Sequence, residues 1–193
     1  VTSAALANPG IGFSLSIDGK EILLFPQAAD LRERLGLIYG KEIEAALLQI
    51  EAFADAVKVH GFTAGPSITR KNRSDIRLFV NSRPVSSRSI IYAVIDGFGT
   101  LLMRGQYPVS AVFIDIEPAL IDVNVHPAKA EIKFREESAV FGMVKRAVAS
   151  ALGSSDLTRN ISFEREAQDS RSGYSEGIKA VSYTHLTLPT KRI

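Results

Sequence analysis

Three short stretches between residues 109 and 135 alternate apolar with polar residues, and this alternation constrains the fold more than any other feature. In the first stretch, Val112, Ile114 and Ile116 occupy every second position. Successive side chains of a β-strand point to opposite faces, so a period of two predicts strands. Pro127 breaks the second stretch, because proline cannot donate to a strand ladder. The three predicted strands span residues 109–116, 121–126 and 130–135.

Two other segments have the period of an amphipathic helix. Between Ser87 and Phe98, apolar residues form one stripe at Ile90, Ile91, Val94, Ile95 and Phe98. A second helix is predicted for Glu136–Leu152, with Gly153 as its C-terminal stop. Helices with one apolar stripe pack on a sheet, so the sequence predicts an α+β fold.

The first half of the chain predicts a hairpin, short helices and further strands. Asp18-Gly19 lies between two β-rich runs and is a strong hairpin-turn signal. Asp30 is the expected N-cap of a helix that Gly40 ends. Helical stretches are predicted over Val1–Ala7, Leu31–Tyr39 and Lys41–Leu48, and strands over Ile11–Ile17, Lys20–Phe25, Gln49–Ala54, Ala56–Thr63 and Asp75–Asn81.

The chain is expected to be a fragment of a longer protein, since it begins with Val1 rather than methionine. Residues 1–28 are expected to form the edge of one domain, residues 29–52 a helical connector, and residues 53–152 a complete domain of sheet and helices. Residues 153–180 are rich in Ser, Arg, Glu and Gly and predict a flexible linker. Residues 181–193 (VSYTHLTLPTKRI) are expected to be a non-native tail.

Composition excludes several classes of function. The chain has no cysteine, which rules out disulfides, thiolate metal sites and a thiol nucleophile. Its three histidines, His60, His126 and His185, do not have metal-ligand spacing, so no metal site is predicted. Neither a P-loop nor a GxSxG elbow occurs. No apolar run approaches the roughly 20 residues that span a bilayer, so a cytoplasmic protein is expected.

The stretch from Asp122 to Lys129 places a lysine just after an alternating strand that ends at a proline. A lysine in a generic turn is most often simply solvated. The alternative is a phosphate contact, because lysine carries a compact charge on a long stem and reaches phosphates held by a neighbouring element. Asn124 and His126 share a strand face and are expected to fix the turn that aims Lys129.

A second stretch, Phe79–Val85, is followed closely by Arg88. Its common interpretation is a strand, a turn at Asn81 and a helix with Pro84 in the first turn. The functional alternative is that Arg83 and Arg88 bind phosphate near a helix N-terminus.

The segments DIRLFVNSRPV and RGQYPVSAVFIDIEPALIDVNVHPAKAEIKF together resemble the MutL family of DNA mismatch repair proteins. The resemblance runs from about Val1 to Leu152. It implies the end of a GHKL-type ATPase domain over residues 1–28, followed by a transducer domain. That transducer is similar to the second domain of a small-subunit ribosomal protein, with a left-handed β-α-β crossover.

The resemblance implies that Lys129 contacts the γ-phosphate of ATP, supported by Asn124, His126 and Pro127. ATP and Mg²⁺ would be bound by an upstream part of the parent protein. The catalytic residues of the family also belong upstream, so this segment is expected to be inactive as an ATPase on its own.

The resemblance also implies DNA binding at Arg88, and Arg83 and the loop cations Arg70, Lys71 and Arg73 are further candidate contacts. Any contact is expected to be to backbone phosphate and so independent of sequence. The family often has glycine at the position of Ser82 and arginine or another polar residue at that of Ser86, which leaves the strength of DNA binding open. Implied partners are DNA, a mismatch-recognition protein of the MutS type, and a second copy through the N-terminal halves. No membrane partner is expected.

Two other functions stay open from the sequence. The same fold could serve as a stand-alone nucleic-acid-binding module without an ATP switch. A type II topoisomerase transducer is built alike, but the HPAK motif at residues 126–129 argues against it. An upstream reading frame encoding a GHKL core would distinguish a repair ATPase from the stand-alone module.

Overall fold

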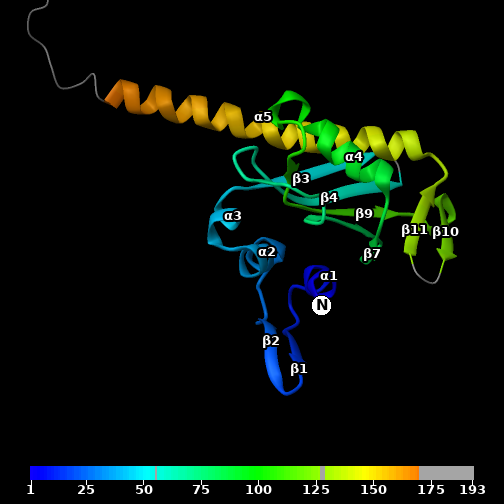
Figure 1. Cartoon of the computed structure of the whole chain (residues 1–193). Coiled ribbons are helices and arrows are strands. Elements are labelled where there is room, and N and C mark those ends of the chain that lie inside the picture. Colours follow the sequence, from blue (N-terminus) through cyan, green and yellow to red (C-terminus); the bar gives the residue numbers. More distant parts are fainter. Residues whose placement is uncertain (55, 127–128, 170–193) are drawn as a thin grey trace, which may run out of the picture. The chain divides into compact units, whose positions relative to one another are not determined.

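The computed structural model describes residues 1–169 except residues 55, 127 and 128 (Figure 1). Two units make up the chain, residues 1–157 and 158–193, and the first contains a mixed five-stranded sheet. Its strands are β3 (Leu47–Ala54), β4 (Val57–Ala64), β6 (Ile76–Val80), β7 (Arg83–Val85) and β9 (Ser110–Ile116). Their order is β3-β4-β9-β6-β7.

Three two-stranded pairs accompany the main sheet in the described part of the chain. They are β1 (Phe13–Ile17) with β2 (Lys20–Phe25), β5 (Thr69–Arg70) with β8 (Tyr107–Pro108), and β10 (Ile121–His126) with β11 (Lys129–Phe134). The first pair confirms the predicted hairpin, because Asp18 and Gly19 adopt φ angles of 52° and 76°. Positive φ at both central residues is the geometry of the tightest hairpin turns.

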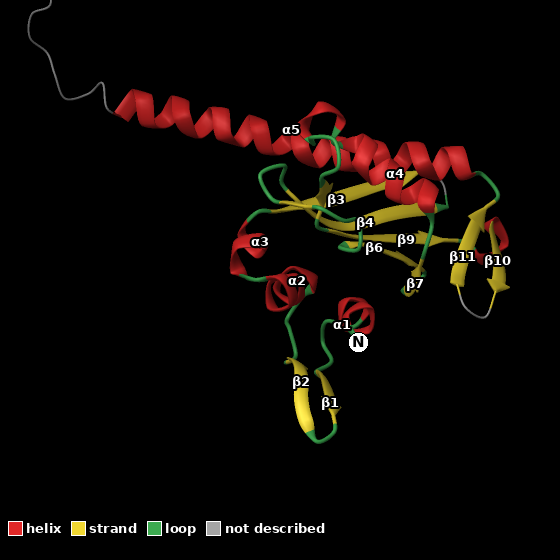
Figure 2. Cartoon of the chain, viewed as in Figure 1, coloured by secondary structure: helices red, strands yellow, loops and turns green. Residues whose placement is uncertain are grey.

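Helices lie on both faces of the main sheet (Figure 2). One face is covered by α4 (Arg88–Gly97) and by residues 140–152 of α5 (Glu137–Asp169), and the other by α1 (Thr2–Ala7), α2 (Leu31–Tyr39) and α3 (Lys41–Ala45). Two short 3-10 helices, η1 (Gly99–Leu101) and η2 (Pro118–Leu120), connect elements. These layers confirm the α+β class.

Strand β9 is the centre of the fold. Val112 and Ile114 lie in the core under α4 and α5, whereas Ala111 and Phe113 lie in the second core under α1 and α2. Six of its seven residues are buried, because both faces of the sheet are covered. The alternation predicted for residues 112–116 is therefore confirmed as one face of a strand buried on both sides.

The chain crosses from β6 to a parallel neighbour, β9, by way of β7 and α4. Parallel neighbours need such a long connection, and the helix packs its apolar stripe on the sheet. Ile90, Val94 and Phe98 are buried in that core, as predicted. The left-handed sense of this crossover stays a prediction.

Helix α2 begins as the sequence predicts. The Asp30 carboxylate accepts a hydrogen bond from the Glu33 backbone N–H at 2.8 Å, and the Glu33 carboxylate accepts one from the Ala29 N–H at 2.6 Å. This reciprocal arrangement satisfies two backbone donors that the helix itself leaves free. Gly40 ends the helix with a φ of 103°.

Three predicted boundaries are wrong. Pro84 lies in β7 and not in the first turn of a helix; β7 is an edge strand, where proline is tolerated. The helical stretch predicted to reach residue 48 ends at Ala45, because Leu47 already pairs with Ala64. Gly153 does not stop α5, which continues to Asp169. The first strand of the main sheet thus begins before residue 53, the expected start of the second domain.

Candidate functional site

The β10–β11 hairpin carries the predicted phosphate-contacting lysine. His126 pairs with Lys129, Asn124 with Glu131 and Asp122 with Lys133 in the antiparallel register. Lys129 is therefore the first residue of β11, next to the connection between the strands, and in Figure 1 the hairpin extends beyond the main sheet. The hairpin register agrees with the two predicted strands.

The base of this hairpin is anchored in the main core. Phe134, the last residue of β11, is 6% exposed and belongs to the core under α4 and α5. The Arg135 backbone N–H donates to the Leu120 carbonyl at 3.0 Å. Phe134 is buried at the base, whereas the next residue pair of the hairpin, Asp122 with Lys133, is exposed.

The predicted aiming of Lys129 falls outside what the structure describes. Pro127 lies outside the described residues, and so do the side chains of residues 123–131. The hydrogen bond expected between Asn124 and His126, and the direction of the Lys129 amine, stay predictions.

Asn81 has a structural task that the sequence did not reveal. With Ser82 it forms the turn between β6 and β7, at φ angles of 48° and 65°. Its side-chain amide donates to the Ile116 carbonyl at 2.9 Å, and its side-chain oxygen accepts from the Ile116 N–H at 3.0 Å. These bonds tie the turn to the end of β9.

Arg83 and Arg88 are both exposed, but they do not share a helix terminus. Arg83 lies in β7 and pairs with Val80, and α4 begins five residues later at Arg88. Arg88 is the first residue of α4, just after Ser87, whose hydroxyl accepts a hydrogen bond from the Ile90 N–H at 3.3 Å. Arg88 therefore keeps the predicted position beside a helix N-terminus.

The loop cations lie at the opposite end of β6 from Arg83. Arg70 is in β5 and forms an ion pair with Asp75, with 3.6 Å between Nε and Oδ2. Lys71 and Arg73 are exposed in the loop that leads into Ile76. Four residue steps along a strand separate Ile76 from Val80, about 13 Å. The predicted DNA-contacting residues therefore fall into two groups, one before β6 and one after it.

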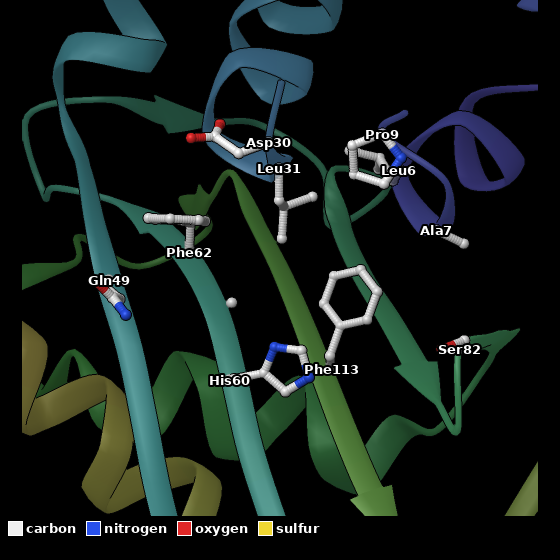
Figure 3. Close-up of a pocket in the computed structure, with 11 residues that line it drawn as sticks. Leu6, Ala7, Pro9, Asp30, Leu31, Gln49, His60, Phe62, Ser82 and Phe113 are labelled. Atoms are coloured by element: carbon white, nitrogen blue, oxygen red, sulfur yellow. The ribbon is translucent and has the colours of Figure 1, made fainter. Parts of the chain in front are cut away.

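A cavity of about 380 Å³ opens under the sheet between α1, the start of α2 and strands β3, β4 and β9 (Figure 3). Leu6, Leu31, Phe62 and Phe113 supply apolar walls, and His60 lines the floor. The His60 ring stacks on Phe113 with centroids 5.2 Å apart, and its Nε2 lies 3.1 Å from an oxygen of Asp115. From the sequence, His60 was only a histidine without metal-ligand spacing. Its contacts could not be predicted, because Phe113 pairs with it across β4 and β9 and Asp115 lies two residues further along β9.

Arg34 was also missed by the sequence. It is fully buried on α2, and its Nη2 donates to the carbonyls of Pro9 and Ile11, each at 2.6 Å. Burial lowers the pKa of this guanidinium, and the nearby Glu33 carboxylate opposes that shift. The bonds join the connector helix to the segment after α1.

The described residues contain no cluster of three or more metal-ligating side chains. Nor does any described helix combine the length and apolar character needed to cross a membrane.

Comparisons with known proteins identify the family. Residues 35–153 match the family model described as DNA mismatch repair protein, C-terminal domain. The chain is 38% identical over 172 residues to the DNA mismatch repair protein MutL of Opitutus terrae, covering 89% of this chain and 26% of that protein. It is 38% identical over 157 residues to MutL of Symbiobacterium thermophilum, covering 81% of this chain and 25% of that protein.

The chain therefore spans about a quarter of the length of the curated relatives it matches. A crystal structure of the N-terminal domain of a DNA repair protein has the same fold, with a TM-score of 0.66, 22% identity, and coverage of 81% of this chain and 52% of that one. On the match to residues 35–153, this chain belongs to the MutL family of DNA mismatch repair proteins.

Proposed function

We propose that this segment is the transducer of a MutL-type repair ATPase, in which Lys129 senses the γ-phosphate of ATP bound by the preceding ATPase domain. The observation that carries the proposal is the position of Lys129, first in β11 beside the connection of a hairpin whose base is anchored by Phe134. A cation at the end of an anchored arm reaches a neighbouring domain without disturbing its own core.

The sensing step is a difference in affinity. The lysine ammonium attracts the terminal phosphate when ATP is bound and loses that partner after hydrolysis. One charge-assisted hydrogen bond is worth on the order of 1–3 kcal/mol, enough to bias a balanced equilibrium between open and closed domain arrangements. Closure would in turn favour pairing of two N-terminal halves, and a MutS-type protein would be the mismatch-recognising partner.

The residues of this chain could supply one contact to ATP but not a complete ATP-binding site. The sequence has no P-loop, and the described residues hold no metal cluster. ATP and Mg²⁺ would therefore be held upstream, where ATP supplies the phosphoryl group, and Lys129 would supply positive charge from the transducer side.

The test is ATP turnover by a protein that carries this segment behind its own ATPase domain. Lys129→Ala is expected to lower kcat about tenfold, since one charge-assisted contact is lost, with an unchanged unfolding midpoint. Lys133→Ala is the matched control, because Lys133 is exposed on the same strand β11. Turnover equal to wild type in Lys129→Ala would remove the sensing role and favour a nucleic-acid-binding module without an ATP switch.

The proposal includes DNA binding through backbone phosphates. Arg88 is exposed at the first position of α4, beside backbone N–H groups that also favour phosphate. Arg88→Glu is expected to weaken binding of a duplex and to reduce the slope of log K against log salt concentration by about one. Titration of labelled duplex at several salt concentrations measures both quantities. A slope identical to that of wild type would place Arg88 outside the interface.

A further inference from the structure

One end of the main sheet is uncovered on the face that carries α1, α2 and α3. Side chains alternate between the two faces along a strand, so Phe53 of β3, His60 of β4 and Asp115 of β9 all lie on this face. Phe53 is 76% exposed, more than any other large apolar residue in the described part of the chain. We call the uncovered end the open face, and it consists of Glu51, Phe53, Lys58, His60 and Asp115.

Three aromatic rings form a ladder that ends at the open face. Phe79 pairs with Phe113 across β6 and β9, and Phe113 pairs with His60 across β9 and β4. The ring centroids of Phe79 and Phe113 are 4.4 Å apart, those of Phe113 and His60 are 5.2 Å apart, and both pairs are stacked. The next strand, β3, places Glu51 opposite His60, whose side chain is 37% exposed. The ladder therefore ends at the His60 ring, where a fourth ring from another molecule could stack.

The cavity beside this ladder suits an apolar or aromatic group without negative charge. Leu31, Phe62 and Phe113 stand around its volume of about 380 Å³, which is within the range of known ligand pockets (Figure 3). Among the described residues that line it, Asp30 is the one ionisable group apart from His60. A phosphate in the cavity would meet this carboxylate and no permanent cation of that lining, so the cavity disfavours a nucleotide or the DNA backbone.

The charges of the open face and of the cavity lining favour a basic partner. Together these residues include three carboxylates and one permanent cation, namely Asp30, Glu51, Asp115 and Lys58. The Glu51 carboxylate takes part in none of the ion pairs in the described part of the chain. The nearby guanidinium groups of Arg32 and Arg34 already donate to backbone carbonyls. A locally negative rim on a chain of net charge +2 attracts a basic segment.

We propose that the open face and the adjoining cavity dock a basic segment of a partner protein through one aromatic side chain of that segment. The partner's ring enters the cavity and stacks on His60 as the fourth ring of the ladder, and a neighbouring lysine or arginine pairs with Glu51. Phe53 adds apolar contact beside it. Aromatic residues and arginine are the commonest anchors of protein interfaces. This inference goes beyond the proposed function, because it needs neither Lys129 nor the residues proposed to contact DNA.

A tryptophan peptide reports directly on this docking site, because the chain contains no tryptophan of its own. The probe is the peptide Lys-Lys-Trp-Lys-Lys, blocked at both ends, titrated with the whole chain and followed by its tryptophan fluorescence. Binding with a blue-shifted emission is expected, since the indole leaves water for an apolar cavity. The peptide Glu-Glu-Trp-Glu-Glu is expected to bind about tenfold more weakly, because the carboxylates of the rim repel it. No binding of the basic peptide, or equal binding of the two, would overturn the proposal.

Phe53→Ser removes apolar surface from the open face without changing the core. Affinity for the basic peptide is expected to fall about fivefold, because Phe53 is partly buried when the peptide is bound. The unfolding midpoint is expected to stay near that of wild type, since the side chain is exposed. Met103→Ser is the matched control: Met103 is 73% exposed in the loop after η1, outside the open face, and its loss should leave the affinity unchanged.

Glu51→Lys reverses one charge at the rim. It is expected to weaken binding of the basic peptide and to strengthen binding of the acidic one, so the preference between the two peptides shrinks about tenfold. Glu21→Lys makes the same change on β2, in a hairpin that extends away from the main sheet, and should leave the preference as in wild type (Figure 1). Equal effects of the two substitutions would mean that only the net charge of the chain matters, which contradicts docking at this face.

Other occupants of the open face would give distinct results, each of which overturns the partner assignment. If no peptide binds and Phe53→Ser converts a dimer of the chain into a monomer in sedimentation velocity, a second copy covers the face. If Phe53→Ser lowers affinity for duplex DNA, the face belongs to the nucleic-acid interface. If no peptide binds and Phe53→Ser lowers the unfolding midpoint in a protein that carries the ATPase domain, that domain covers the face. In none of these cases is the proposed role of Lys129 affected.

Discussion

Gly61, in the middle of β4, is a position where the sheet accepts no side chain. Its φ is 136°, and a Cβ added there would lie 2.1 Å from the Ala111 carbonyl oxygen on β9. The obstacle is backbone on a central strand, which cannot rotate away. Glycine is therefore required here both by conformation and by space.

Gly61→Ala is expected to destabilise the chain by about 3 kcal/mol or more, because strained backbone and a steric clash add. Gly65→Ala is the control: the nearest atom to its Cβ would be 3.8 Å away, and its φ is not positive. That variant should change the free energy of unfolding by less than about 0.5 kcal/mol. Urea unfolding followed by circular dichroism measures both, and equal midpoints would contradict the account.

At the scale of single residues, the sequence predicts interactions between residues that are close to each other along the chain. Asp30 was identified as an N-cap because its partner is three residues away. Arg34 was not identified as buried, because the carbonyls it binds, those of Pro9 and Ile11, come from a remote part of the chain.

The contact of α4 with α5 depends on a glycine at the end of α4. A Cβ on Gly97 would lie 2.7 Å from the Val148 Cβ and 2.9 Å from the Lys145 carbonyl oxygen. An ion pair beside it, 2.7 Å between Lys145 Nζ and an oxygen of Asp96, joins the same helices. The helices approach closely because Gly97 has no side chain.

Two helix glycines are therefore expected to respond with opposite signs. Gly97→Ala should destabilise by about 2 kcal/mol, because the helices must separate. Gly142→Ala should stabilise by about 0.5–1 kcal/mol, since alanine is the better helix former and its Cβ would meet only the mobile end of Arg146 at 3.2 Å. Thermal and urea unfolding of the two variants give the signs, and a stabilised Gly97→Ala would show that the close approach is not needed.

At the level of elements, strands and helices could be predicted but several of their ends could not. Asn81 signals a turn in any case, yet only pairing shows that the turn joins β6 to an edge strand containing Pro84. Gly153 is a common helix stop, and α5 nevertheless continues through it. Proline and glycine permit an end without requiring one, so the outcome is decided by tertiary contacts.

At the scale of the whole first unit, the family match and the fold agree with the family expected from two motifs. The five-stranded sheet between two helical layers gives β10 and β11 a rigid base in the core. The residues proposed to contact DNA lie in β5, in the loop before β6, in β7 and in α4. Their separation could not be predicted because it depends on which end of β6 each turn joins.

The central claim is that Lys129 reports the presence of the last phosphate. The most direct measurement compares the Kd for a non-hydrolysable ATP analogue with the Kd for ADP, in a protein carrying this segment behind its ATPase domain. Lys129→Ala is expected to weaken analogue binding about tenfold and to leave ADP binding unchanged, since only the analogue carries the group contacted. An equal loss for both nucleotides, or no loss for either, would contradict the claim.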